Sequence, residues 1–593
     1  MEPSKSVDLT TRLASLGVGL TVALAALGLR LWQLQILQAD YYAQLADVNR
    51  LRVHRLPSPR GLILDRRGTP LVTNRPAFSV WVVPAEVVDP GRVLPQLARV
   101  VGVPEDDLWA RWERSRRRPF EPMRVRRDVG IRVVTALEER RQSLPGVQVE
   151  AEPVRVYPFG PAAAHVLGYL GEVSPEELEA LRPRGYRAGD LIGKAGVERA
   201  YDEVLRGSDG EHAVEVDAAG RPLRVLREQP GQPGHTLVLA LDRELQEEAA
   251  RQLQGRSGAV VAMDPWTGEV LAMASSPSFD PNLFSVGISE QDWQRLSADR
   301  RNPLLNRATA SAYEPGSVFK VVTGLAALQE GRAASSSRFL CKGSLQLGRW
   351  VFRDLVAHGV VDFTTGVAQS CNVMFWTLGL ALGPDLLAEY AQRLGFGSPT
   401  GVDLPLEVPG MIPDPAYKQR TWQEPWYPGD TLNMAIGQGF VLVTPLQVAR
   451  AMSAVANGGI LLRPRLVRAV VSPEGHVVRT FSPEAQARLP VSDQALAALR
   501  RGLVAVVDRG TGQAARVEGL QVAGKTGSAE TARGRPHAWF AGYAPASQPR
   551  IVVVVLVEHG YRGGVSAAPI ARAILERWWT GLRSARGGNL WAR

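Results

Sequence analysis

Lysine is scarce in this sequence of 593 residues, although basic residues as a whole are not. Only six of the 69 basic side chains are lysines, so arginine occupies almost every position where a plain surface charge is enough. Arginine does not release its proton in proteins, whereas a lysine with a depressed pKa can act as a base. A lysine within a motif that needs a neutral amine is therefore a candidate for chemistry.

Cysteine is rarer still, with two residues in the chain, and zinc-finger and RNP motifs are missing. The net charge of +10 would suit an anionic partner, but the arginines are spread along the chain without a polybasic block. Nucleic acid is thus a weak choice, and an anionic polymer or a membrane surface fits equally well. The hydrophobic content of 45% is that of globular domains, and the length predicts about two to four of them.

One long hydrophobic run is present near the N-terminus. Residues 13–29 carry no charge, and with Leu31 and Trp32 the run approaches the roughly 20 residues that cross a bilayer. A cleavable signal peptide is the alternative, but no A-x-A-like site follows, and the helical pattern continues through Leu37. We predict a short tail over 1–12 and an uncleaved transmembrane anchor over 13–32. The flanking charges nearly balance and do not give its orientation.

The stretch from 33 to 228 offers no nucleophile with a base, no phosphate loop and no metal cluster. It mixes short strands, turns and charged helical stretches, so we interpret it as a β-rich pedestal that binds partners. The sequence QPGQPG at 229–234 is the clearest linker in the chain. Beyond it we predict a compact domain over 235–582 and a loose tail over 583–593.

The domain after the linker has the pattern of an α+β fold. Its expected strands form two groups separated by helices, which favours one antiparallel sheet covered by helices. Asp242 is placed to cap a helix after the first strand, and the turn DPWTG joins the next two. The expected strands are 237–241, 259–263, 270–274, 522–530, 538–543 and 551–557.

The segment SAYEPGSVFKVVTGLAALQE, residues 311–330, predicts a helix that activates one hydroxyl. Apolar residues recur at helical spacing from Val318 onward, after a break at Pro315. Ser317 then lies in the first turn, where unpaired N–H groups and the helix dipole favour negative charge. Lys320 follows one turn later on the same face, which brings its amine within reach of the serine oxygen. A lone SxxK motif arises by chance in large proteins, so it needs support from elsewhere.

Two further motifs supply that support. Ser370-Cys371-Asn372 follows 53 residues after Ser317, and Lys525-Thr526-Gly527-Ser528 lies among the later strands. SxxK, SxN and KTG in this order are the signature of the penicillin-recognising serine acyltransferases. The chain resembles a class B, monofunctional penicillin-binding protein, most like the elongation type, penicillin-binding protein 2. PSPRGLILDRRG after the anchor and IGKAGVERAYD in the pedestal also resemble that family, so the likeness covers nearly the whole length.

The resemblance implies a peptidoglycan D,D-transpeptidase that needs no cofactor for catalysis. Ser317 would attack the penultimate D-alanine carbonyl of a stem peptide ending in D-Ala-D-Ala, and an amine of a neighbouring stem would take over the acyl group. Lys320 would accept the proton, its pKa lowered by burial and by Lys525. Ser370 would relay the proton to the leaving nitrogen, and Asn372 would hold the substrate amide.

The KTG strand would line the substrate cleft. Lys525 and Ser528 would bind the terminal carboxylate, Thr526 and Gly527 belong to the same substrate-binding strand, and backbone N–H groups of the nucleophile and Ser528 would form the oxyanion hole. The family more often has threonine at the position of Ser528, which keeps the hydroxyl. His537 lies close enough in sequence to reach the cleft edge, but lone histidines of this kind are mostly incidental.

The two cysteines leave three states open. A compartment outside the cytoplasm permits a disulfide between Cys341 and Cys371. The cysteine of SxN, together with Asp354, His358 and Cys341, resembles a structural zinc site of elongation-type members, although the spacing is irregular for zinc. Unpaired thiols are the third state. Division-type relatives usually have serine at the position of Cys371, which favours the elongation type.

Several other functions compete with this interpretation. A β-lactamase normally lacks the pedestal and anchor, and a bifunctional synthase needs paired acidic residues that 33–235 does not show. A β-lactam sensor needs a signalling domain, for which the predicted tail leaves no room. A division-type member, or a scaffold that mainly activates a SEDS-type glycan polymerase, stays an alternative.

The resemblance also implies partners and a location. Nascent peptidoglycan stem peptides would be the substrate, and β-lactams would acylate the nucleophile. A SEDS-type (RodA-like) glycosyltransferase would bind through the transmembrane helix and the pedestal. The chain would be a single-pass protein of the cytoplasmic (inner) membrane with its catalytic domain outside, and no nucleic-acid partner is expected.

Overall fold

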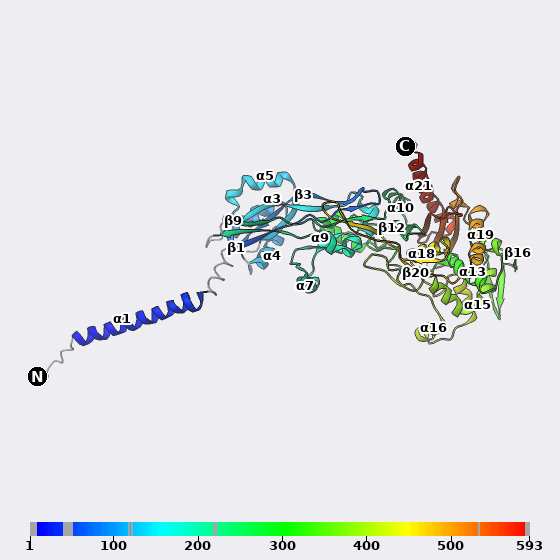
Figure 1. Cartoon of the computed structure of the whole chain (residues 1–593), viewed down its shortest axis with the longest axis horizontal. Coiled ribbons are helices and arrows are strands. Elements are labelled where there is room, and N and C mark those ends of the chain that lie inside the picture. The colour runs from blue at the N-terminus through cyan, green and yellow to red at the C-terminus, as the bar shows by residue number, and fades with distance from the viewer. Residues whose placement is uncertain are drawn as a thin grey trace. The chain divides into compact units, whose positions relative to one another are not determined.

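The computed structural model describes residues 9–39, 51–116, 119, 122–216, 222–531 and 534–587 (Figure 1). The chain divides into two compact units that alternate along the sequence. Residues 1–58, 78–152 and 208–232 belong to the first unit, and residues 59–77, 153–207 and 233–593 to the second. The pedestal range predicted from the sequence, 33–228, therefore contributes chain to both units.

The N-terminal helix α1 (Leu9–Trp32) continues into a π-helical turn, η1 (Gln33–Leu37), which confirms that the helical pattern runs on through Leu37. The stretch Arg12–Leu37 is long and apolar enough to cross a membrane, by length and composition. Its leucines are exposed, Leu16 to 71%. An apolar surface of this size normally contacts a membrane or another protein.

The rest of the first unit has its own core beneath helices α3 and α4. Asp89 caps α3 by accepting a hydrogen bond from the Arg92 N–H, and Leu94, Leu97 and Trp112 pack inward. The strands β1, β8 and β9 form a separate antiparallel sheet. The elements that lie wholly or, for β3 and β5, partly in the first unit are β1 (Leu51–Leu56), β3 (Pro70–Val82), η2 (Pro84–Glu86), α3 (Pro90–Val101), α4 (Glu105–Ser115), β4 (Met123–Val129), α5 (Ile131–Glu139), η3 (Arg141–Ser143), β5 (Val147–Val156), β8 (Gly210–Val216) and β9 (Pro222–Gln229).

In the second unit, a buried carboxylate organises the stretch that includes residues 153–207. Glu198 is 0% exposed, and its two oxygens lie 2.7 Å from Arg155 Nε and 2.9 Å from Arg60 Nη2. Tyr157 also donates its hydroxyl to Glu198. The bounds here are β2 (Ile63–Leu64), η4 (Gly160–Ala163), α6 (Ala164–Leu167), β6 (Leu170–Glu172), α7 (Pro175–Leu181), η5 (Arg182–Arg184), β7 (Leu191–Gly193), α8 (Gly196–Ala200) and α9 (Asp202–Arg206).

Substitution Glu198→Gln is expected to lower the free energy of unfolding by about 3 kcal/mol, because it leaves the buried Arg155 guanidinium without a carboxylate and Arg60 with Asp202 alone. Urea unfolding of the purified protein measures this. The matched control is Glu203→Gln, whose partner Arg184 is largely exposed, and there we expect a loss of less than about 1 kcal/mol. Equal losses for the two variants would contradict the argument.

The part of the second unit that carries the three motifs contains the predicted antiparallel sheet, with strand order β12-β11-β23-β22-β21. Alternate residues face opposite sides: Val261 and Val554 join one buried cluster, whereas Val260 and Val553 join another. Helices cover both faces, and Asp242 caps α10 as predicted. The bounds are α10 (Arg243–Gln252), β11 (Gly258–Met263), β12 (Val270–Ser276), β21 (Ala523–Ala529), β22 (His537–Ala544), β23 (Ile551–Val557), α20 (Gly563–Ser566) and α21 (Ala568–Gly587).

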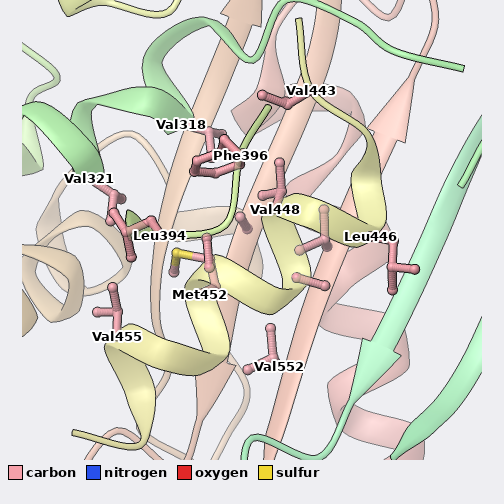
Figure 2. Close-up of a cluster of buried hydrophobic side chains, with 14 of the residues drawn as sticks. Val318, Val321, Leu394, Phe396, Val443, Leu446, Val448, Met452, Val455 and Val552 are labelled. Carbon is pink, nitrogen blue, oxygen red and sulfur yellow. The ribbon is translucent and has the colours of Figure 1, made fainter. Parts of the chain in front are cut away.

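Helix α18 (Pro445–Ala456) packs between the sheet and the segment that carries the first motif. Thr444 caps it in a reciprocal capping box with Gln447. Figure 2 shows Val448 and Met452 of this helix among apolar side chains from both neighbours. Those side chains include Val318, Val321 and Val552. The segment that carries the first motif is therefore held against a buried apolar core.

The remaining elements of the second unit surround this core. Strands β10, β18 and β19 form an antiparallel run, and β10 also pairs in parallel with β2. Helix α21 extends to Gly587, into the stretch from 583 that was expected to be a loose tail, and residues 588–593 of that stretch lie outside the described residues. The bounds are β10 (Thr236–Leu239), α11 (Asn282–Ser285), α12 (Glu290–Ala298), β13 (Arg338–Cys341), β14 (Ser344–Leu347), β15 (Trp350–Arg353), β16 (Gly359–Asp362), α14 (Phe363–Ala368), α15 (Asn372–Arg393), α16 (Pro415–Trp422), α17 (Pro428–Ala435), β17 (Ile460–Leu462), β18 (Val467–Val471), β19 (Val477–Thr480), β20 (Ala485–Arg488), α19 (Asp493–Arg509) and η7 (Gln513–Ala515).

Candidate active site

The nucleophile candidate Ser317 lies in a tight turn of 3-10 helix, η6 (Gly316–Phe319), and α13 (Lys320–Gln329) begins directly after it. Gly316 has φ +52°, in the left-handed region that favours glycine. A Cβ there would lie 2.6 Å from the carbonyl oxygen of Ser528, so no other residue fits. Glycine thus lets the serine turn approach the KTG strand closely.

The amine of Lys320 is buried and directed at the SxN motif. Its Nζ donates to the Asn372 Oδ1 at 2.6 Å and to the Ser370 carbonyl at 2.7 Å, and it lies 3.2 Å from the Ser370 Oγ. The side chain is 1% exposed. Among the described residues, the Ser317 hydroxyl is not one of its hydrogen-bond partners, which differs from the short reach expected from the SxxK spacing.

Ser370 joins the two motif lysines through its hydroxyl. Lys525 donates from Nζ to the Ser370 Oγ at 2.9 Å, while Lys320 approaches the same oxygen from α13. Ser370 has φ +58°, an uncommon conformation for a residue with a Cβ. Such strain persists only where the surroundings hold it, and it often marks functional sites.

Strand β21 forms the edge of the sheet and carries the KTG motif beside the serine turn. A Cβ on Gly527 would lie 2.8 Å from the Pro315 carbonyl oxygen, so glycine allows the strand to pass this closely. Thr526 shares a 2.6 Å hydrogen bond with Thr511, and Ser528 Oγ accepts from the Gly563 N–H at 3.4 Å. The structure therefore brings all three motifs together.

Burial shifts the pKa values of both motif lysines downward. Removal of the Lys320 amine from water lowers its pKa from 10.5 to about 7, against the opposing pull of Asp354 and Cys371. The pKa of Lys525 is also held well below its ordinary value, first by burial and then by repulsion from Lys320. At neutral pH this pair can lose a proton, which a pair of arginines cannot do.

The four predicted metal ligands also come together. The ligand atoms of Cys341, Asp354, His358 and Cys371 all lie within 4.8 Å of one another. Cys341 Sγ lies 3.3 Å from His358 Nδ1 and 3.7 Å from Asp354 Oδ2. Both cysteines are free thiols, so the structure does not contain the disulfide that the sequence left open.

Two thiols, an imidazole and a carboxylate at these separations form a donor set of the kind that zinc prefers. Burial, followed by the neighbouring Cys341 and Asp354, raises the pKa of the Cys371 thiol to about 12. A cation at the centre would reverse that effect, because metal-bound thiols lose their proton. The residues therefore fit a zinc ion.

The metal-ligand candidates also support the SxN motif, a link that the sequence did not reveal. Asp354 Oδ2 accepts hydrogen bonds from the Asn372 N–H at 2.7 Å and the Val373 N–H at 3.3 Å. Cys371 caps the same helix, α15, through its sulfur. The negative carboxylate at the helix N-terminus adds a favourable interaction with the helix dipole.

Two residues next to the motifs have surroundings that the sequence reasoning did not supply. His537 accepts from the His559 N–H, and its ring lies 5.5 Å from the Tyr313 ring, so its contacts are with the turn after β23 and with the residues before the serine turn. Glu314, inside YEPGSVFK, accepts from Gln438, and burial raises its pKa to about 7. Its position three residues before Ser317 was the only sequence signal.

Comparison with protein-family models gives two matches. The model for the penicillin binding protein transpeptidase domain matches residues 258–576, which include all three motifs. The model for the penicillin-binding protein dimerisation domain matches residues 55–239.

Relatives along the full length agree with these matches. The peptidoglycan D,D-transpeptidase MrdA of Acinetobacter baumannii is 35% identical over 95% of this chain and 86% of its own length. MrdA of Escherichia coli K12 is 32% identical over 94% of this chain and 92% of its own length.

Solved structures show the same likeness. Penicillin-binding protein PBP2 in complex with MreC from Helicobacter pylori has a TM-score of 0.79 at 29% identity, covering 90% of this chain and 99% of that one. A chain of a peptidoglycan synthase complex has a TM-score of 0.72 at 34% identity, covering 96% of this chain and 99% of that one.

The family and reaction predicted from SxxK, SxN and KTG are thus confirmed, together with an α+β fold of several domains. The chain belongs to the elongation-type class B penicillin-binding proteins, the peptidoglycan D,D-transpeptidases.

Proposed function

We propose that this transpeptidase works through an acyl-enzyme on Ser317, with Lys320 as the base that activates it. The observation that carries the proposal is the convergence of two buried lysines on one hydroxyl: Lys525 Nζ at 2.9 Å and Lys320 Nζ at 3.2 Å from the Ser370 Oγ. An amine with a pKa near 7 is suited to accept a proton at neutral pH.

The proposed proton path uses the contacts of Lys320 and Lys525 with the Ser370 hydroxyl. The neutral Lys320 amine takes the Ser317 hydroxyl proton as the oxygen attacks the penultimate D-alanine carbonyl. The proton passes through the Ser370 hydroxyl to the nitrogen of the terminal D-alanine, which leaves as the amine when the C–N bond breaks. The amine of an acceptor stem then attacks the ester, its proton returns by the same route, and Ser317 is released.

The other motif residues bind the donor stem in this proposal. Asn372 holds a substrate amide, and Lys525 and Ser528 bind the terminal carboxylate beside Thr526 and Gly527 of β21. Backbone N–H groups of Ser317 and Ser528 bind the oxyanion. The close approach of Gly316 to the Ser528 carbonyl supports this arrangement, because it brings the two segments into contact.

A fluorescent penicillin tests the acyl-enzyme directly. We expect the full-length protein, solubilised in detergent, to form one covalent adduct, and mass spectrometry of its peptides to place the adduct on Ser317. An adduct on another residue, or the absence of one at saturating penicillin, would refute the proposal.

We further propose that Cys341, Asp354, His358 and Cys371 hold a structural zinc ion. When bound, zinc would supply a fixed tetrahedral anchor for its ligands and no step of the acyl transfer. Two of the ligands connect this anchor to the SxN motif: the Asp354 carboxylate accepts a hydrogen bond from the Asn372 N–H, and Cys371 is the middle residue of SxN. An ordered cluster therefore keeps Ser370 and Asn372 in position.

Substitution Cys341→Ser is expected to abolish zinc binding, because it removes one of two thiolate ligands. Elemental analysis of the purified protein should find about one zinc per wild-type chain and only background in the variant. His476→Ala, an exposed histidine outside the cluster, is the control and should keep its zinc. Zinc missing from the wild type, or unchanged in Cys341→Ser, would contradict the assignment.

For the location and partners, we propose a single-pass protein anchored by α1 in the cytoplasmic membrane, with the catalytic part outside. A glycan polymerase of the SEDS (RodA-like) type would bind α1 and the pedestal. The similar chain that comes from a peptidoglycan synthase complex supports this, as does the similar PBP2 bound to MreC. A role mainly as a polymerase activator is the second candidate, and it predicts that a catalytically dead Ser317 variant still supports glycan synthesis.

A further inference from the structure

A small lobe beside the active site exposes an unusual amount of apolar surface. We define the two-hairpin lobe as residues 338–362, in which β13 pairs with β16 and β14 pairs with β15. Six large apolar side chains within it are between 54% and 82% exposed. They are Leu340, Trp350, Val351, Leu355, Val356 and Val360.

The strand register shows that some of these exposed apolar side chains lie next to one another. Leu340 lies directly opposite Val360 on β13 and β16, so the two make one apolar spot on the outer face. The Cys341 sulfur, which points to the opposite, buried face of β13, lies 3.7 Å from the Val356 carbonyl, so the loop after β15 is held against this strand. On the inner face, Phe352 packs edge-on against Trp376 at 5.9 Å and fixes the β14–β15 hairpin to the core. Exposed apolar groups held this rigidly indicate a binding surface.

The same lobe carries a net positive charge, with four basic residues and two acidic ones. Its exposed basic side chains are Arg338, Lys342, Arg349 and Arg353, and none lies within 4.0 Å of a carboxylate in the described part of the chain. Of the two acidic residues, Asp354 holds the Asn372 backbone, and Asp362 caps α14 while lying opposite Arg338 in the strand register. A ligand for this surface therefore carries negative charge together with apolar groups.

We propose that the two-hairpin lobe is a second binding site for the peptidoglycan strand, outside the catalytic cleft. Peptidoglycan carries carboxylates on its stem peptides, which suit arginine, and sugar rings and alanine methyls, which suit exposed apolar and indole surface. The lobe is also continuous with the site, because Asp354 at the end of β15 contacts the SxN motif. A strand that enters the cleft is thus within reach of the lobe.

The test uses full-length protein in detergent, first acylated with penicillin so that the cleft is blocked. Soluble, uncross-linked peptidoglycan strands with intact stems are the probe. We expect the acylated wild type to bind them with an affinity that falls as salt rises, and the double variant R349E/W350A to bind at least tenfold more weakly. The matched control is V478A/R479E, an exposed apolar residue and arginine on β19, which should bind within twofold of the wild type.

Each outcome decides the proposal. Labelling of Ser317 by fluorescent penicillin is measured on every variant, so a failure of the proposed acyl-enzyme is seen separately from a failure of strand binding. The proposal is overturned if acylated wild type does not bind strands, or if R349E/W350A binds as well as the control. Vesicles of phosphatidylglycerol form a second arm: a variant that loses vesicle binding but keeps strand binding would identify a membrane-contact surface instead.

Discussion

Replacing Ser317 by alanine is expected to abolish covalent labelling by penicillin completely, because the ester bond can form only on the serine oxygen. In the described part of the chain, Ser317 lies in a glycine-enforced turn beside the KTG strand, three residues before Lys320, whose pKa is lowered to about 7. Ser370 is the alternative nucleophile to test, because its half-buried hydroxyl contacts both motif lysines. Gel fluorescence after labelling measures the outcome.

Two variants make that experiment decisive. Ser297→Ala removes an exposed hydroxyl on α12 and should label like the wild type, which controls for handling. Ser370→Ala should still form an adduct, but about 100-fold more slowly, because it removes a proton relay and not the nucleophile. If Ser317→Ala is still labelled, or if folded Ser370→Ala is not labelled, then Ser370 is the nucleophile and Ser317 is not.

The local parts of this site were predictable from sequence because they depend on short-range rules. The cap at Asp242, the β11–β12 hairpin and the five strands of the sheet follow from capping, turn and alternation patterns. The three motifs then identified the family, since their order and residue types are more specific than any fold pattern. The capping box at Thr444 belongs to the same local class.

The features that the sequence did not reveal all depend on contacts between distant residues. Lys320 turns toward Ser370, fifty residues away, because the SxN motif offers its amine two oxygen acceptors in a buried site, the Ser370 carbonyl and the Asn372 side-chain Oδ1. The positive φ of Ser370 is imposed by packing and has no sequence signal comparable to glycine. The chain passes back and forth between the two units, and the sequence pattern does not show this. It predicted a single domain boundary, at the linker 229–234.

Replacing Lys320 by arginine is expected to slow acylation by about 10³-fold, although charge and hydrogen-bonding capacity are kept. The reason is that arginine stays protonated and cannot accept the serine proton. The matched control is Lys418→Arg: Lys418 is also a buried lysine, 4% exposed, but it serves as a cation paired with Asp430 at 2.6 Å. Its acylation rate should stay within a few-fold of the wild type, which separates loss of a base from the steric cost of a larger side chain.

The pH dependence of acylation distinguishes a base from a fixed charge. Lys320 must be neutral to act, and its pKa is about 7, so the wild-type rate should rise about tenfold per pH unit below 7 and level off above it. Lys320→Arg should be slow and flat over the same range, because its side chain does not titrate there. Lys418→Arg should keep the wild-type profile. A wild-type rate that is level from pH 5 to 8, or an equal rise with pH in Lys320→Arg, would show that another group is the base. Lys525 is then the structural candidate, because its pKa is also depressed and its amine contacts the same Ser370 hydroxyl.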